Sequence, residues 1–259
     1  EDGIRHSSTS RGLGDVYKRQ AIDALKNKKG RRSVEMALLK AASADPFWGV
    51  RREAIQGLSK LKPKQYAKEL MEISEGQDNR VRRAIWSSLK NYKGDKEVSA
   101  FLQDVISTDQ KYYSISDAFR ALVTVDTSAA RKRVEALLDT DSHNDVIRKA
   151  ALFYFGHVKN RYNYNRLKEF AEYGVFSWKS RPTVISELGK YQKYSPKTLE
   201  FILPFIHDND RFVRMAVIKH IGAHGYVHHF GLLDSVVGLD PVLSINALRA
   251  KDKINSRIK

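Results

Sequence analysis

Apolar residues recur at three- and four-residue spacing along most of the chain, and this spacing predicts amphipathic helices. The clearest stretch is DPFWGVRREAIQGLSKL, which starts at Asp45 and carries its apolar face at Phe47, Val50, Ala54, Leu58 and Leu61. Asp45 fits an N-cap and Pro46 the first helical position. Alternating β-branched runs bounded by hairpin turns, which predict strands, are missing from the sequence. The pattern therefore predicts an all-α fold.

The same apolar pattern repeats with a period of about 32 residues. It returns as NRVRRAIWSSLK, YSISDAFRALVT, DVIRKAALFYFG, WKSRPTVISELG and RFVRMAVIKHIG. The lead positions of the successive repeats are Val50, Val81, Ile115, Ile147, Ser180, Val213 and Leu243. Second amphipathic stretches such as EVSAFLQDVI and YNRLKEFAEY lie between them. One helical hairpin cannot bury its apolar face alone, whereas stacked hairpins share a continuous core, so we predict an α-solenoid of about seven hairpins.

Two further positions recur at fixed distances from the lead positions, one usually arginine and one often glycine. We call them the arginine column and the glycine column. The residue after the lead is Arg51, Arg82, Arg148, Arg181 or Arg214 in five repeats. Stacked guanidinium groups could hold a peptide carboxylate or phosphates. Asp45 and Asp208 each stand six residues before an arginine of this column, so we favour a structural ladder with the aspartate of the preceding turn. Three repeats also carry a glycine where a helix would end on a left-handed residue, at Gly156, Gly189 and Gly222.

An aspartate followed by Val-Arg, small residues and Leu-Gly is similar to HEAT repeats. More narrowly, ADPFWGVRREAIQGLSKL followed by NRVRRAIWSSLKNY resembles the helical C-terminal domain of the gluzincin aminopeptidases, which are aminopeptidase-N-like zinc metallopeptidases. The resemblance covers essentially all of residues 21–259, and DPFWGVR is its most specific part. It implies a non-catalytic domain that packs on its own catalytic domain and limits the access of peptide substrates.

The catalytic signature of that family, H-E-x-x-H, is absent from the sequence. The resemblance therefore implies no catalytic residue and no cofactor in this chain, and it places the zinc in a catalytic domain outside it. The alternative is an independent HEAT-type scaffold that binds protein or nucleic acid. The HEAT-like DNA alkylation-repair glycosylases are also basic and contain tryptophan, but their pattern does not include DPFWGVR.

The first twenty residues, EDGIRHSSTSRGLGDVYKRQ, differ from the rest because they lack apolar periodicity. SRGLGDVYKRQ resembles the in-frame translation of a transposase adapter of DNA sequencing libraries, and the residues before it fit the outer adapter except at His6. We therefore expect residues 1–20 to be a non-native adapter-derived tail. Residues 21–259 are then an N-terminally truncated solenoid whose localisation the sequence does not give.

The composition is strongly basic, which favours acidic binding partners. The 259 residues include 46 lysines and arginines against 30 aspartates and glutamates, a net charge of +16. Such a balance favours acidic proteins, nucleic acid or anionic surfaces. The chain has no cysteine, which excludes disulfides and thiolate chemistry, and no apolar run approaches the length of a membrane span.

Two clusters are candidates for chemistry. In HIGAHGYVHH, His220 and His224 stand one turn apart, as two zinc ligands on a helix would. Ile221 follows His220 where a metallopeptidase has its glutamate, so we favour a solvent-facing helix end and expect no metal site. The stretch GHVKNRYNYNRLKEFAEYGVFSWKSR interleaves aromatic and basic residues. Its candidate binding residues, on which bases could stack, are Tyr162, Tyr164, Trp178 and Arg181. Ordinary packing between helices is the alternative.

Overall fold

The computed structural model describes residues 8–26, 31–61 and 64–258, with side chains described from Gly14 onward. Within these ranges the chain forms helices and turns and no strand, as the periodicity predicts. It divides into two compact units, Glu1–Arg133 and Val134–Lys259.

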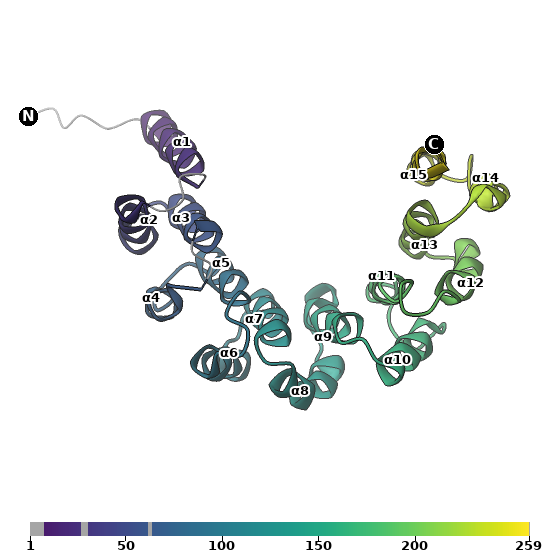
Figure 1. Cartoon of the computed structure of the whole chain (residues 1–259), viewed down its shortest axis with the longest axis horizontal. Helices are drawn as coiled ribbons and strands as arrows, with labels where there is room; N and C mark the ends of the chain where they lie inside the picture. Colours follow the sequence, from purple (N-terminus) through teal and green to yellow (C-terminus); the bar gives the residue numbers. More distant parts are fainter. Residues whose placement is uncertain (1–7, 27–30, 62–63, 259) are drawn as a thin grey trace, which may run out of the picture. The chain divides into compact units, whose positions relative to one another are not determined.

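The first unit is two layers of helices. Its elements are α1 (Ser8–Leu25), α2 (Arg32–Ala44), α3 (Trp48–Leu61), α4 (Ala67–Ile73), α5 (Asn79–Leu89), α6 (Lys96–Thr108) and α7 (Tyr112–Val125). Helices α1, α3, α5 and α7 contact one another in this order and make one layer (Figure 1). Helices α2, α4 and α6 pack against α3, α5 and α7 as the second layer. The boundary between the units falls within α8 (Thr127–Asp139).

The second unit repeats this arrangement. Its elements are η1 (His143–Asp145), α9 (Val146–His157), α10 (Arg161–Ala171), α11 (Arg181–Gly189), α12 (Thr198–Ile202), η2 (Leu203–His207), α13 (Arg211–His224), η3 (Val227–His229), α14 (Phe230–Asp234) and α15 (Pro241–Ile258). Helices α9, α11, α13 and α15 contact one another in order and make one layer. Elements α10, α12, η2 and α14 pack against them as the second layer. Side chains at the N-caps help to start these helices. Asp210, for example, accepts a hydrogen bond from the Phe212 backbone N–H at 2.7 Å.

The predicted lead positions lie in the core. Val50, Val81, Ile147 and Val213 are at most 2% exposed, which confirms that prediction. Ile115, the lead of the next repeat after Val81, differs from these four because it is half-buried, while its neighbours Ser114 and Ser116 are buried. Ser114 Oγ accepts a buried hydrogen bond from Trp86 Nε1 of the preceding repeat at 2.8 Å, and Phe119 and Val123 keep the register of the core.

The three glycines that recur at one position of the repeat, Gly156, Gly189 and Gly222, do not form the left-handed helix ends that the sequence predicts. Gly156, Gly189 and Gly222 all lie inside helices, and none has a positive φ. A Cβ at Gly156 would stand 2.7 Å from Glu187 Cδ of the next repeat, and one at Gly222 would stand 3.0 Å from Ala250 Cα. The prediction of left-handed helix ends is therefore wrong. These positions are glycine because the next helix of the layer passes too close for a side chain.

Helix α1 continues through residue 20, where the predicted tail ends. Val16 and Tyr17 are 45% and 66% exposed, whereas Ile22 is 5% exposed. Lys18 forms an ion pair with Asp45 at 3.1 Å. Residues 1–7 and the side chain of Leu13 lie outside the described part of the structure. The adapter origin of residues 1–20 stays a prediction.

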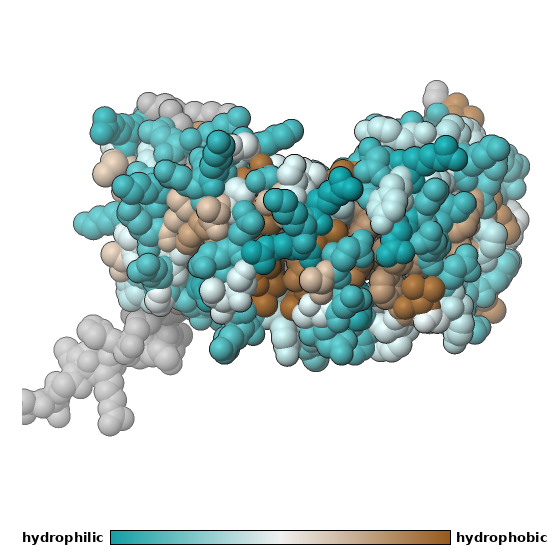
Figure 2. All heavy atoms as spheres, turned by 90° about the horizontal axis from the view of Figure 1, so that it is seen from below, coloured by the Kyte–Doolittle hydropathy of each residue, from teal (hydrophilic) through white to brown (hydrophobic). Residues whose placement is uncertain are grey.

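The surface agrees with the basic, hydrophilic composition. Hydrophilic side chains cover most of the face shown in Figure 2, and apolar ones show mainly in the furrows between them. None of the helices in the described ranges is long and apolar enough to cross a membrane.

Candidate functional site

A cleft of about 660 Å³ opens in the second unit, between the loop before α11 and the start of α13. We call it the Trp178 cleft. Its lining residues are Tyr173, Gly174, Phe176, Trp178, Arg181, Asp208, Asn209, Asp210, Arg211, Phe212 and Arg214. Three aromatic side chains at its rim are turned to solvent, with exposed fractions of 81% for Tyr173, 60% for Trp178 and 43% for Phe212. Exposed aromatic side chains gathered around one cleft are typical of binding surfaces.

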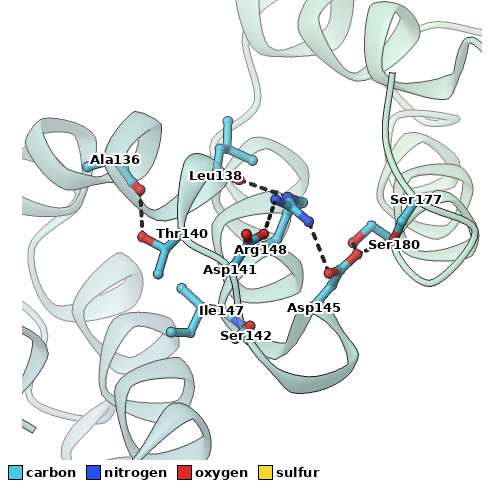
Figure 3. Close-up of polar contacts among 10 residues, drawn as sticks. All are labelled: Ala136, Leu138, Thr140, Asp141, Ser142, Asp145, Ile147, Arg148, Ser177 and Ser180. Atoms are coloured by element: carbon cyan, nitrogen blue, oxygen red, sulfur yellow. Dashed lines mark hydrogen bonds and ion pairs between the residues drawn. The ribbon is translucent and has the colours of Figure 1, made fainter. Parts of the chain in front are cut away.

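The loop that carries Trp178 is tied to the preceding repeat through Asp145 (Figure 3). Asp145 Oδ2 accepts hydrogen bonds from the hydroxyls of Ser177 and Ser180, the latter at 2.9 Å. Its Oδ1 forms an ion pair with Arg148 Nη1 at 3.0 Å. Arg148 is itself held by the Leu138 carbonyl, to which its Nε donates at 2.8 Å. The two serines flank Trp178, so this network fixes the backbone from which the indole projects.

The turn that carries Asp145 has a strained backbone, and the pKa of the Asp145 carboxyl is shifted. Asn144 and Asp145 have φ values of 54° and 53°, in the left-handed region that non-glycine residues rarely adopt. Burial raises the pKa of the Asp145 carboxyl, but the hydrogen bonds from Ser177 and Ser180 and the Arg148 charge outweigh it and hold the pKa below its usual range. The carboxylate form, which can accept both serine hydroxyls, is thus favoured. Strain of this kind persists where the surroundings over-determine it, often at functional sites.

A buried ion pair lies in the wall of the cleft. Arg181 Nη1 and Nη2 donate to Asp208 Oδ1 and Oδ2 at 3.1 and 2.7 Å, and Nη2 also reaches the Ala171 carbonyl at 3.3 Å. Only 6% and 9% of the two charged side chains are exposed. Asp208 is therefore neutralised and oriented by Arg181.

Other polar atoms of the cleft have no partner in the described part of the chain. Arg181 Nε, Arg214 Nε and Asp210 Oδ2 are buried without a hydrogen bond. The Arg214 guanidinium has no hydrogen bond or ion pair with any described residue, since Arg181 occupies the carboxylate of Asp208. A buried polar atom that stays unpaired costs about 1–3 kcal/mol. The residues that line the cleft thus include two unpaired donors and one unpaired acceptor.

The four predicted binding residues do not form one site. Trp178 and Arg181 share the Trp178 cleft. Tyr164 instead lines a separate hollow of about 440 Å³, where its ring lies 5.1 Å from that of Tyr191. Tyr162 is 62% exposed and lines neither space. The helical turn of α10 explains this split, because the sequence neighbours Tyr162 and Tyr164 point to different sides of it.

The arginine column pairs with acids, but in a different register from the one expected. Arg82 contacts Asp109, and Arg181 contacts Asp208, each an aspartate in the turn before the next repeat's helix. Arg148 alone of the column reaches the acid of its own preceding turn, Asp145. The Arg82–Asp109 and Arg181–Asp208 contacts join consecutive repeats, whereas the Arg148–Asp145 contact stays within one turn.

Arg51 and Arg214 depart from the expected ladder. Arg51 Nη1 donates to the backbone carbonyls of Asp45 and Pro46 at 2.6 and 3.1 Å, and the Asp45 carboxylate instead accepts from the Phe47 N–H at 2.9 Å. The side chain of Asp45 therefore closes a turn three residues before α3 begins at Trp48, and Asp45 is not the N-cap of that helix. For Arg214 the expected partner, Asp208, is occupied by Arg181.

The histidine cluster does not have the solvent-facing form that we expected. His220 is 8% exposed, and its Nε2 lies 3.2 Å from Gln192 Oε1. The missing side chain of Gly189 lets the imidazole approach, since a Cβ there would stand 2.7 Å from Nδ1. Burial, followed by the charge of His224, lowers the pKa of His220 to about 4. Among the described residues, no group of three or more metal-ligating side chains is placed to hold a metal ion.

Several residues of the cleft were not expected from the sequence. Tyr173 lies near Trp178 in the chain but is not among the predicted binding residues, whereas Asp210 and Phe212 belong to the next repeat. One signal could have found them. The repeat period places position 178 beside position 211 of the next repeat, so aromatic and charged residues at these two places line one space.

A family model described as HEAT repeats matches residues 11–90 and 35–123. Together with the layered helical hairpins, it settles the fold. The chain is an all-α solenoid of HEAT-like repeats. No curated protein matches the chain. Nine chains of solved structures match. One is human deoxyhypusine hydroxylase in complex with glycerol, at 16% identity and a TM-score of 0.38, with 95% of this chain and 99% of that chain covered.

Proposed function

We propose that this HEAT-like solenoid is a non-catalytic scaffold that binds another protein surface, with the Trp178 cleft as its contact site. The observation that carries the proposal is the combination of three exposed aromatic rings with unpaired polar atoms in one cleft. Aromatic and arginine side chains are the residues on which protein interfaces most often depend. A loop held in place by Asp145 presents them in a fixed arrangement, which lowers the ordering cost of binding.

In its narrower form, the proposal is that the partner is the catalytic domain of a zinc aminopeptidase to which the solenoid is covalently joined. The support is the DPFWGVR stretch and its resemblance to the C-terminal domains of that family. Peptide hydrolysis in such an enzyme needs zinc to polarise the carbonyl and a glutamate to move the proton. The described residues offer no ligand group for that metal. The solenoid would act by sterics, restricting long peptide substrates.

The DNA upstream of the chain tests the narrower form. An adapter-free read that continues the frame into an H-E-x-x-H motif with a downstream glutamate supports it, and a frame without this motif contradicts it. In the joined enzyme, removing the solenoid should leave turnover of a small aminoacyl reporter largely intact and relax the discrimination against long peptides. Equal loss on both substrates contradicts an access role, provided that circular dichroism shows the remainder folded.

An independent scaffold is the second candidate, favoured by the net charge of +16 and by the interleaved cations and aromatic rings of the second unit. Its partner would be an acidic protein or a nucleic acid. Either form predicts that the purified full chain releases no amino acid from aminoacyl substrates. Measurable hydrolysis by the chain alone, retained after treatment with a chelator and repeated purification, contradicts both.

A further inference from the structure

A second hollow of about 480 Å³ lies on the face made by α11, α13 and α15. We call it the basic hollow. Lys219, Arg249 and Lys253 line it, and no acidic residue does. None of these three side chains forms an ion pair with a described residue. The rest of its lining is mainly apolar, including Pro182 and Met215, with the polar residues Ser186 and Asn246.

Phe212 lines both the basic hollow and the Trp178 cleft, so the two spaces adjoin across one exposed ring. An extended chain that leaves the cleft beside Phe212 would enter the basic hollow. In the basic hollow the chain would contact three cations that have no carboxylate partner within the described part of this protein. In the cleft it would contact Arg214, which also lacks a carboxylate partner among the described residues. The charge of this combined surface calls for a ligand that carries carboxylates or phosphates.

We propose that the Trp178 cleft and the basic hollow together bind an extended acidic peptide segment of a partner protein, in which glutamate or aspartate alternates with apolar residues. The inference rests on the proposed scaffold function and names the chemistry of its ligand. An apolar side chain of the segment packs between Trp178 and Phe212, and one carboxylate pairs with Arg214. Further carboxylates face the cations of the basic hollow.

The unpaired acceptor in the cleft favours a peptide over a nucleic acid. Asp210 Oδ2 needs an N–H donor, and a peptide backbone supplies one at every residue. The aliphatic part of the basic hollow, which includes Met215 and Ile218, also suits a leucine side chain better than a base.

Fluorescence anisotropy with the full chain tests this inference. The probes are a labelled peptide in which glutamate alternates with leucine and phenylalanine, the same peptide with lysine in place of glutamate, and single-stranded DNA of mixed sequence. The variants are Trp178→Ala and Arg214→Gln. Tyr162→Ala and Arg131→Gln are the matched controls, because both are exposed residues outside the two hollows.

We expect the glutamate peptide to bind more tightly than the other probes and to lose affinity about tenfold in each cleft variant. The controls should bind as the parent chain does. Equal affinity for the glutamate and lysine peptides overturns the inference, as does a Trp178→Ala chain that binds like Tyr162→Ala. Tighter binding of DNA that depends on Trp178 also overturns it and assigns the cleft to nucleic acid.

These outcomes are distinct from failure of the scaffold function. If no acidic peptide binds, yet deletion of the solenoid from the joined enzyme relaxes discrimination against long peptides, the inference fails and the proposed function stands. If the glutamate peptide binds at Trp178 while deletion affects both substrates equally, the access role fails and the peptide site stands.

Discussion

Trp48 of the first unit and Trp178 of the second occupy the same position of their repeats, two residues before the leads Val50 and Ser180. Trp48 is half-buried, and the guanidinium groups of Arg80 and Arg52 lie 4.4 and 5.3 Å from its ring. Trp178 is 60% exposed, with the Lys179 ammonium 5.8 Å away. The first tryptophan is covered by its own chain, and the second is open to a partner.

The neighbouring arginines show the same difference. Arg51 Nη1 donates to two backbone carbonyls of its own turn, and its buried Nε has no partner among the described residues. Arg181 takes the aspartate of the next repeat, and this leaves Arg214 without an acid. One repeat pattern thus gives a closed edge in one unit and an open, charged cleft in the other. Both edges have arginine Nε atoms without a partner among the described residues, so the exposed aromatic rings around the cleft, together with the unpaired Arg214, mark the candidate site.

The largest effect on stability is expected at the ion pair behind the cleft. Arg181→Met leaves the Asp208 carboxylate buried without its partner, so the free energy of unfolding should fall by about 3–5 kcal/mol in urea denaturation. Arg211→Met is the control, because its contact with Asp240 is 3.6 Å long and Arg211 is half exposed; it should cost less than about 1 kcal/mol. Equal losses for the two variants contradict the structural importance of the buried pair.

The close approach of helices at the glycine column comes next. Gly156→Ala places a methyl group against Glu187 of α11 and should lower the free energy of unfolding by about 1–3 kcal/mol. Gly231→Ala is the matched control, because nothing lies within 4 Å of its Cβ position and its φ is not positive. Thermal denaturation of both variants decides the point, and a neutral Gly156→Ala refutes the close approach.

Acid should weaken the second unit through His220. Its pKa is 6.5 when unfolded and about 4 when folded, so between these values the unfolded chain binds a proton that the folded chain does not. Stability is therefore complete above pH 6.5 and declines as the pH falls toward 4. His220→Gln should flatten this slope, measured as urea midpoints across that range, whereas exposed His207→Gln should not. An unchanged slope in His220→Gln rules out this histidine as the cause.

The smallest stability effect separates the two tryptophans. Trp178→Ala removes an exposed ring and should change the free energy of unfolding by less than about 0.5 kcal/mol. Trp48→Ala removes packing and two cation–π contacts and should cost at least about 1 kcal/mol more. Parallel urea titrations measure both. Equal losses of unfolding free energy in the two variants would contradict the distinction between the covered Trp48 and the open Trp178.

Much of the fold could be predicted from the sequence because it depends on local periodicity. The helical hairpins and the buried leads Val50 and Val213 follow from apolar spacing alone. The sequence does not reveal the purpose of Gly156, Gly189 and Gly222, because the close approach of the next helix depends on packing between repeats, which a single helix does not encode. The ladder was assigned to the preceding turn for the same reason, although Arg181 reaches forward to Asp208.

The candidate site could be predicted only in part. Trp178 and Arg181 were found by the mixture of aromatic and basic residues, and they share the cleft. Tyr162 lies near them in the sequence, but residues that are close along a helix point in different directions, so it does not line the cleft. Arg214 is unpaired because the Asp208 carboxylate binds Arg181 of the preceding repeat. No pattern within one repeat contains that information.

Hydrogen exchange of the full chain, with and without the glutamate-containing peptide, tests the central claim most directly. Our account predicts slower exchange on peptide binding in residues 173–181 and 208–214, which carry the Trp178 cleft, and unchanged exchange in residues 46–52 around the covered Trp48. Protection around Trp48, or peptide binding without protection at the Trp178 cleft, would contradict it.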